Sequence, residues 1–195
     1  MKITTLHDMF VHTLKDIHYA ETKILKALPK MIKAAQNADL TEALVTHKAE
    51  TEGQIERIKQ VFGLLGMKPS AVECDAINGI LKEAEGMLED TAGQPMSDTG
   101  VIASGQAVEH YEIVRYRSLV MWAGALGLEK AAEWLQLSLD EERAADEKLN
   151  LFAAYCQTEP GTMTAADGKP SVTGEMKGQA QTDKAGGSAS RSSAA

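Results

Sequence analysis

Residues 106–116 read QAVEHYEIVRY, a stretch in which Glu109 and Glu112 lie three residues apart. That spacing puts both carboxylates near one face of a helix. The stretch otherwise has the composition of a buried helix, and carboxylates are almost never fully buried unless they are paired or bind a metal. The pattern therefore predicts a core-facing helix whose acidic residues serve a purpose beyond packing.

The segments on either side show apolar faces that are interrupted only by acids. The contact face of a bundle helix advances by alternate steps of four and three residues. Over residues 10–35 these positions are apolar except for Glu21, and over residues 128–156 only Glu142 and Asp146 interrupt them. Both segments therefore predict long helices that place an acid in the bundle interior.

The segment between them along the chain, residues 40–66, has a less regular face. Its line of contact positions includes His47, Glu50 and Gln54. His47 stands one turn before Glu50, where it can donate a hydrogen bond to a carboxylate or lie partly exposed. A single acid usually lies at the edge of an apolar stripe with its carboxylate in solvent. Four helices that each place an acid near mid-length instead favour a shared site.

Five helical segments are expected, because Gly and Pro fall mostly between the periodic stretches. The middle one is short but can carry the chain from one end of a bundle to the other, as the crossover of ferritin-like folds does. The predicted fold is therefore all-α, a ferritin-like four-helix bundle with a short extra crossover helix between helices two and three. Ser97 or Asp98 is the expected N-cap of the fourth segment. The helices are predicted at about residues 5–37, 40–66, 71–88, 99–126 and 129–155.

The composition changes near residue 158. Residues 1–157 are predicted to form the bundle, and residues 158–195 are predicted to form a disordered low-complexity tail. The tail has no aromatic residue and almost no aliphatic one, so it buries too little surface to offset the entropy of ordering it.

Composition also limits the partners. The net charge of −8 argues against nucleic acid, because phosphate contacts need a basic face. Cys74 and Cys156 form no redox or metal spacing. The first residues lack the apolar core of a signal peptide, and no run approaches the roughly 20 apolar residues of a membrane span. We therefore expect a cytoplasmic protein with neither nucleic acid nor a membrane as its partner.

Carboxylates that converge in an apolar interior repel one another unless they are protonated, paired with bases or neutralised by cations. Few Lys or Arg residues fall on the predicted contact faces, with Arg57 as the exception. A pair of divalent metal ions is the economical solution, because carboxylates can bridge two ions in a dry cage.

Four motifs together resemble one known family. DIHYAETKILKALPKMIKAA, THKAETEGQIERIKQVFGLLGMKP, VEHYEIVRY and LDEERAAD occur in the order and spacing of the YciE/YciF-type family of bacterial stress-associated, ferritin-like proteins. The likeness covers about residues 4–157. It implies a rubrerythrin- or ferritin-like bundle, a homodimer, and a dinuclear metal site that is usually taken as di-iron, with Mn as the other candidate.

The general ferritin-like pattern also assigns residues. It places single glutamate ligands at Glu21 and Glu109, and the leading acids of two Glu-x-x-His motifs at Glu50 and Glu142.

This chain departs from that pattern at both expected histidines, since Gly53 and Ala145 stand in their places. Gln54 and Asp146, one residue further on, can substitute as oxygen ligands, and Glu112 can add another. An all-oxygen cage favours hard ions such as Mn, Mg or Fe over Zn or Cu.

Two main functions remain open, with a weaker third. The first is a stress-associated protein whose dinuclear centre reduces peroxide or oxygen, or oxidises ferrous iron, as a metal-dependent oxidoreductase. The alternative is a non-catalytic stress or interaction protein whose bundle dimerises and binds cations weakly or not at all; the missing histidines favour it. An iron-storage cage or a DNA-protecting shell is a weaker third reading. No catalytic residue is predicted.

Overall fold

The structure is a computed structural model that describes residues 2–158. These residues form five α-helices and no strand, so the predicted all-α class is confirmed. The segment predicted as a disordered tail lies outside the described residues, apart from Thr158. The helices are α1 (Leu6–Ala34), α2 (Ala38–Leu64), α3 (Asp75–Asp90), α4 (Ser97–Ala125) and α5 (Glu129–Thr158).

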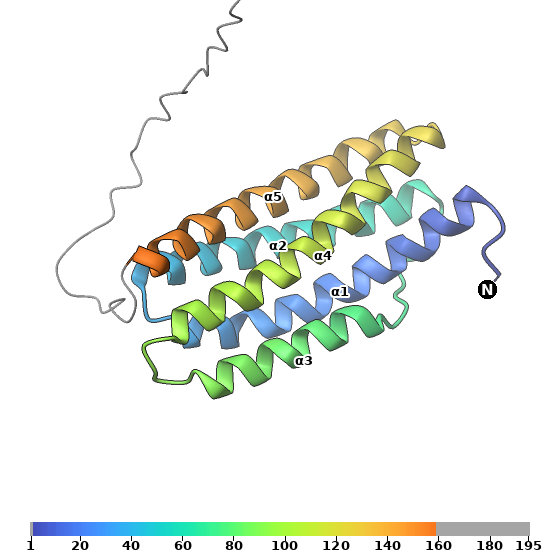
Figure 1. The fold of residues 1–195 in the computed structure, drawn as a ribbon. Coiled ribbons are helices and arrows are strands. Elements are labelled where there is room, and N and C mark those ends of the chain that lie inside the picture. Colours follow the sequence, from blue (N-terminus) through green and yellow to red (C-terminus); the bar gives the residue numbers. More distant parts are fainter. Residues whose placement is uncertain (1, 159–195) are drawn as a thin grey trace, which may run out of the picture. The chain divides into compact units, whose positions relative to one another are not determined.

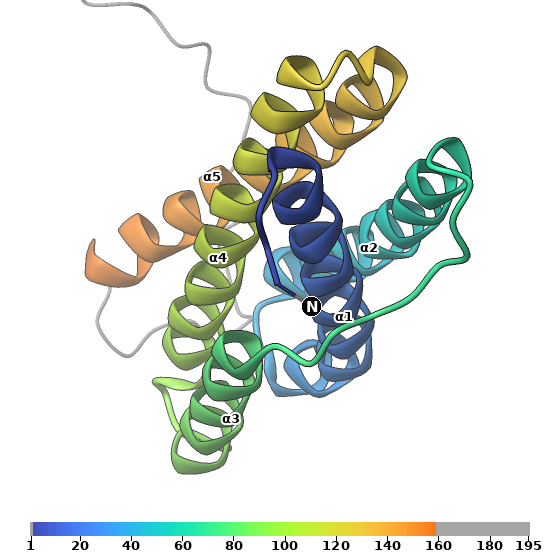
Figure 2. The same cartoon turned by 90° about the vertical axis from the view of Figure 1, so that its right-hand side faces the viewer.

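Four long helices make the bundle, and α3 lies outside it (Figures 1 and 2). The packed neighbours are α1 with α2 and α4, and α5 with α2 and α4. Because α2 and α4 run in the same direction at diagonal corners, the chain between them must travel the length of the bundle (Figure 1). Residues 65–74 and α3 make this crossover, as the sequence predicted, and α3 packs on α1 and α4.

The crossover segment is attached to the outside of α1. The backbone N–H of Val72 donates to the carbonyl of Lys15 at 3.2 Å, and the ring Nδ1 of His18 lies 3.0 Å from the carbonyl oxygen of Ser70. Figure 2 shows this segment passing α1 on its way from the end of α2 to the start of α3. Backbone bonds to a rigid helix fix the path of a segment that has no secondary structure of its own.

The helix ends follow local sequence signals. Thr5 and Asp8 form a capping box at the start of α1, and Asn37 caps α2 by accepting from the N–H of Leu40. Gly66 and Gly127, just past the ends of α2 and α4, have φ of 67° and 69°, which glycine adopts at little cost.

The N-cap predicted for α4 is wrong. Met96 occupies that position and makes no side-chain cap, while Ser97 and Asp98 lie in the first turn. The carboxylate of Asp98 accepts instead from the backbone N–H groups of Gln36 and Asn37, at 2.6 and 3.1 Å. It therefore caps the turn between α1 and α2, a partner that local sequence cannot reveal.

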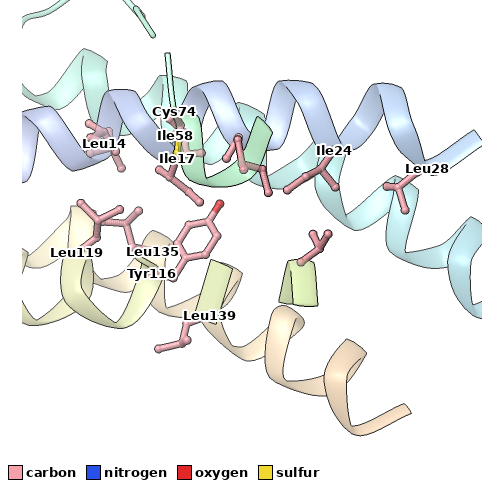
Figure 3. Close-up of a cluster of buried hydrophobic side chains, with 14 of the residues drawn as sticks. Leu14, Ile17, Ile24, Leu28, Ile58, Cys74, Tyr116, Leu119, Leu135 and Leu139 are labelled. Carbon is pink, nitrogen blue, oxygen red and sulfur yellow. The ribbon is translucent and has the colours of Figure 1, made fainter. Parts of the chain in front are cut away.

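The interior is filled by the apolar contact faces of the four long helices. Figure 3 shows side chains of α1 facing those of α2, α4 and α5, with Tyr116 projecting from α4 so that its hydroxyl points toward α1. Buried residues of this face on α1 include Phe10, Leu14, Ile17, Ile24 and Leu28. Within the described part of the chain, no helix is both long and apolar enough to cross a membrane.

Candidate metal centre

Acidic side chains are buried at the middle of the bundle. Glu21 of α1, Glu109 and Glu112 of α4, and Glu142 of α5 are each at most 3% exposed. Apart from one another and Asp146, their neighbours on these contact faces are mostly apolar, so the packing of the helices carries them into the interior. Four of the five carboxylates predicted to face inward from α1, α4 and α5 are therefore brought together.

A histidine from α2 completes the group. His47, Glu109, Glu112 and Glu142 each offer a ligand atom, and these four atoms all lie within 4.8 Å of one another. His47 is 6% exposed, so the alternative of a partly exposed histidine is wrong. A set of one imidazole and three carboxylates at this separation has the donor types and the spacing that a divalent metal ion requires.

Several polar atoms of this cluster have no hydrogen-bond partner. Both carboxylate oxygens of Glu112 are buried without one, and so is one oxygen each of Glu21, Glu109 and Glu142. Buried polar groups in native proteins are nearly always satisfied, and exceptions commonly mark a bound ion or water. The donor set therefore fits a cation well, because inward-facing lone pairs are what a metal needs.

The electrostatics agree with this reading. Burial, and then the charges of Glu142 and Glu21, raise the pKa of Glu112 well above its ordinary value. Burial is also the main cause that raises the pKa of Glu109 to about 7. Without a cation, the cluster must therefore hold protons that a cation would displace.

Glu21 and Glu142 are each held by a neighbouring side chain. The hydroxyl of Tyr116, which is fully buried, donates to Oε1 of Glu21. The amide of Gln54, also fully buried, donates to Oε1 of Glu142. Each carboxylate thus keeps one oxygen bonded to protein and turns its other oxygen, which is unpartnered, into the cluster.

Gln54 is itself held by an ion pair at the edge of the bundle. Its amide nitrogen also lies 3.1 Å from Glu141, and Glu141 pairs with the guanidinium of Arg57. Arg57 donates in addition to the hydroxyl of Ser138 at 3.0 Å. The one basic residue predicted on these faces therefore bonds to Glu141, outside the buried cluster.

His47 connects the buried cluster to the surface. Its Nε2 lies 3.3 Å from Glu109 and its Nδ1 lies 3.5 Å from Glu50. Burial lowers the pKa of His47, but the contact with Glu50 and the charges of Glu142 and Glu21 raise it overall. The same contact lowers the pKa of Glu50.

Two predicted ligands lie at the rim. The side chain of Glu50 is 28% exposed and reaches His47, while that of Asp146 is 17% exposed and lies 3.3 Å from His110. Asp146 also accepts from Asn150 at 3.1 Å. Of the predicted set, Glu21, Gln54, Glu109, Glu112 and Glu142 are buried at the cluster, and Glu50 and Asp146 border it.

Sequence reasoning placed His47 on the contact line of α2 but gave it only a supporting role, although its heptad relation to Gln54 indicates burial. His47 and Gln54 are seven residues apart, about 20° short of two full turns, so both face inward. Glu50, three residues after His47, is turned about 60° away from it.

The comparisons with known proteins point to one family. A family model described as a domain of unknown function (DUF892) matches residues 5–159. Protein YciF of Escherichia coli strain K12 is 41% identical over 154 residues, which cover 78% of this chain and 93% of YciF.

Solved structures agree. The crystal structure of the E. coli stress protein YciF matches with a TM-score of 0.76 and 39% identity, covering 80% of this chain and 99% of that one. YcfI of Rhodopseudomonas palustris, described as a candidate structural protein, matches with a TM-score of 0.74 and 49% identity over 76% of this chain and 95% of YcfI. A protein of Xanthomonas campestris pv. campestris, 19% identical with a TM-score of 0.62, supports the fold alone.

Proposed function

The chain belongs to the DUF892 family, and on that premise we propose that its buried cluster is a carboxylate-rich centre for two divalent metal ions. The observation that carries the proposal is Glu112, whose two oxygens are buried without a partner among three other acids. A fully buried carboxylate in that position is costly unless a cation neutralises it.

Charge balance supports a pair of ions. Four buried glutamates, Glu21, Glu109, Glu112 and Glu142, carry four negative charges when ionised. Two divalent cations would cancel that charge, whereas one would leave two anions unpaired in an apolar interior. In ferritin-like carboxylate proteins, glutamates from the four helices hold a pair of metal ions together with histidines.

The donor types favour iron or manganese. Carboxylate oxygens dominate the set and His47 adds one imidazole. This donor set suits Fe and Mn better than Cu, which prefers softer ligands, or Zn, which prefers a tetrahedral site. A pair of such ions, when bound, supplies electron transfer to small oxygen species or from ferrous iron. The centre would then act on peroxide, oxygen or iron as a metal-dependent oxidoreductase.

The protein's own residues have separable roles in such a centre. Glu112 and Glu109 present oxygens from α4, and His47 presents a ring nitrogen from α2. Tyr116 and Gln54 orient Glu21 and Glu142 by hydrogen bonds to the oxygens that face away from the cluster. Side chains that hydrogen-bond to a metal ligand typically change the metal affinity by about 10- to 100-fold.

Metal analysis tests the proposal. Protein made in iron- or manganese-supplemented culture is expected to hold about two metal ions per chain, and Glu112→Gln and Glu109→Ala are expected to lose them. The control is Glu133→Gln, which removes an exposed acid paired with Lys130. Equal metal content in all four proteins would overturn the proposal.

The alternative is a non-catalytic bundle that serves dimerisation or partner binding. Gly53 and Ala145 favour it, because both histidines of the ferritin-like pattern are missing. It predicts that chelator, iron and manganese leave the melting temperature unchanged, since a ligand bound only by the folded state must raise it.

We further propose a homodimer, as the family resemblance implies, and a cytoplasmic location, as expected from the sequence. Sizing chromatography with light scattering tests the dimer, and a particle larger than a tetramer would revive a storage cage.

A further inference from the structure

A small hollow opens between α2 and α5 beside the metal centre. Its inner wall is formed by His47 and Glu109, whose side chains are 7% and 4% exposed. Its rim carries Glu50 and Lys148, which are more exposed. Its volume is about 20 Å³, which is enough space for about one water molecule.

We infer that this hollow is the entrance by which divalent cations reach the buried cluster, and that Glu50 is the carboxylate that captures them at its rim. The inference rests on the proposed function, since it assigns a loading route to that same centre. It makes Glu50 a transit site for the ion instead of one of its final ligands.

The donors form a continuous path from solvent to the interior. Glu50 is 28% exposed and 3.5 Å from Nδ1 of His47, and Nε2 of the same ring is 3.3 Å from Glu109. A hydrated cation gives up water only where protein donors replace it. Glu50 and then Glu109 supply such oxygens at successive depths, with His47 between them.

Further along the contact between α2 and α5, the acidic residue at the edge of the bundle is already paired. There the guanidinium of Arg57 lies between Glu141 and Ser138, and its side chain is only 18% exposed. This ion pair largely cancels the charge of Glu141, so a divalent ion is attracted less there than at Glu50. The hollow at Glu50 is therefore the more favourable entrance between these two helices.

The hollow exists because residue 145 is small. Ala145 lines it and is 7% exposed, at the position where the ferritin-like pattern has a histidine. A larger side chain projecting from α5 at this position would fill a space of one water molecule. The departure from the pattern thus removes one metal donor and leaves a way in.

Loading kinetics of Mn²⁺ test the inference. Metal-free full-length protein is mixed with Mn²⁺ in a stopped-flow instrument, and a metallochromic dye reports the free ion. The variants are Glu50→Gln, which removes the rim charge at equal size, and Ala145→Leu, which fills the hollow. The matched control is Glu52→Gln, which removes an exposed acid of the same helix that pairs with Lys48.

We expect Glu50→Gln to slow uptake about threefold or more at low ionic strength, with the difference shrinking as salt is raised. Ala145→Leu is expected to slow uptake at every salt concentration. Lys148→Gln is expected to speed it, because an ammonium at the rim repels the ion. Final Mn²⁺ content is expected to match the parent in Glu50→Gln and Lys148→Gln, and Glu52→Gln to match it in rate as well.

Each other result has a distinct meaning. Parent-like rates in Glu50→Gln and Lys148→Gln would overturn the route while leaving the metal centre intact. A lower final Mn²⁺ content in Glu50→Gln would make Glu50 a ligand and overturn its role in transit. Absence of Mn²⁺ uptake by the parent protein would instead refute the proposed function. If circular dichroism shows that Ala145→Leu does not fold, the uptake rates of Glu50→Gln and Lys148→Gln still test the entrance.

Discussion

Nε2 of His47 lies 3.3 Å from Oε1 of Glu109, although the two residues belong to α2 and α4, at diagonal corners of the bundle. A contact across the diagonal passes through the centre of the interior, where apolar side chains would otherwise meet. The bundle therefore gives up core packing at its midpoint to bring an imidazole to a carboxylate. This pair marks the level at which the four helices converge on the cluster.

Removing one buried acid is expected to stabilise the metal-free protein. Glu112→Leu replaces a carboxylate without partners by an apolar group, and replacing buried ionised groups by apolar ones of similar volume can stabilise a protein by up to about 4 kcal/mol. Urea unfolding in chelator at about pH 8 measures the gain. The same variant is expected to lose the stabilisation that Mn²⁺ gives to the parent.

The control is Glu133→Leu, at a site that is 63% exposed, where little change is expected. A Glu112→Leu protein less stable than the metal-free parent would mean that this acid is well solvated or paired in solution.

The stability of the metal-free protein is expected to fall as pH rises from about 4.5 toward 7. Burial raises the pKa of Glu21, Glu112 and Glu142 above the ordinary 4.5, and that of Glu109 to about 7. Each of these groups keeps a proton in the folded state after the unfolded chain has lost it. This stabilisation is therefore complete below the unfolded value and is lost as pH rises through the folded value.

His47 acts with the same sign, because its pKa is raised as well. Urea unfolding in chelator at about pH 5.5 and about pH 8 should show the higher free energy of unfolding at the lower pH. Equal stability at the two values would contradict the burial of ionisable groups, and Glu112→Leu should reduce the difference.

The fold was predictable because its signals are periodic. The helix from Leu6 to Ala34 was expected at about residues 5–37, since the apolar spacing continues over many turns and outweighs local exceptions. The cap at Asp98 was mispredicted, because its carboxylate bonds to Gln36 and Asn37, about sixty residues away.

The site was predictable only in part, for a geometric reason. Glu21 and Glu142 interrupt clean apolar lines, so their burial follows from their neighbours. On α2 the contact line is less regular, and a rotation of about 60° separates inward-facing His47 from the rim residue Glu50. The family pattern named Glu50 as the ligand, and only the packed helices show which face turns inward.

A second group of polar side chains, around Tyr111, is expected to hold the crossover. The hydroxyl of Tyr111 donates to Asp16 at 2.6 Å and lies 3.0 Å from the sulfur of Cys74, at the end of the crossover segment. Arg115 lies 3.2 Å from the same carboxylate. Tyr111→Phe should lower the free energy of unfolding by about 1–2 kcal/mol, because it leaves Asp16 short of one donor.

The matched control is Tyr19→Phe, which removes a 3.1 Å bond to Asn78, an uncharged partner less buried than Asp16, and should cost less. Metal content should be unchanged in both variants. A loss of metal in Tyr111→Phe would show that the crossover and the cluster are coupled.

Gln54 is expected to position Glu142 instead of binding metal itself. Its amide nitrogen donates to Glu142 and to Glu141, and Arg57 fixes Glu141 from outside. Gln54→Met keeps the volume but removes the donor, so Mn²⁺ affinity should fall by about 10- to 100-fold. Arg57→Met should produce a smaller loss, because it acts through one more side chain.

Gln54→Glu separates the two roles of this residue. If Gln54 positions Glu142, a glutamate adds a fifth acid next to Glu141 and Glu142 and lowers the stability of the metal-free protein. If Gln54 is an oxygen ligand, as the sequence pattern allowed, the glutamate should hold Mn²⁺ at least as tightly as the parent does. Mn²⁺ titration of the three variants, with urea unfolding in chelator, therefore distinguishes a hydrogen-bonded support from a metal ligand.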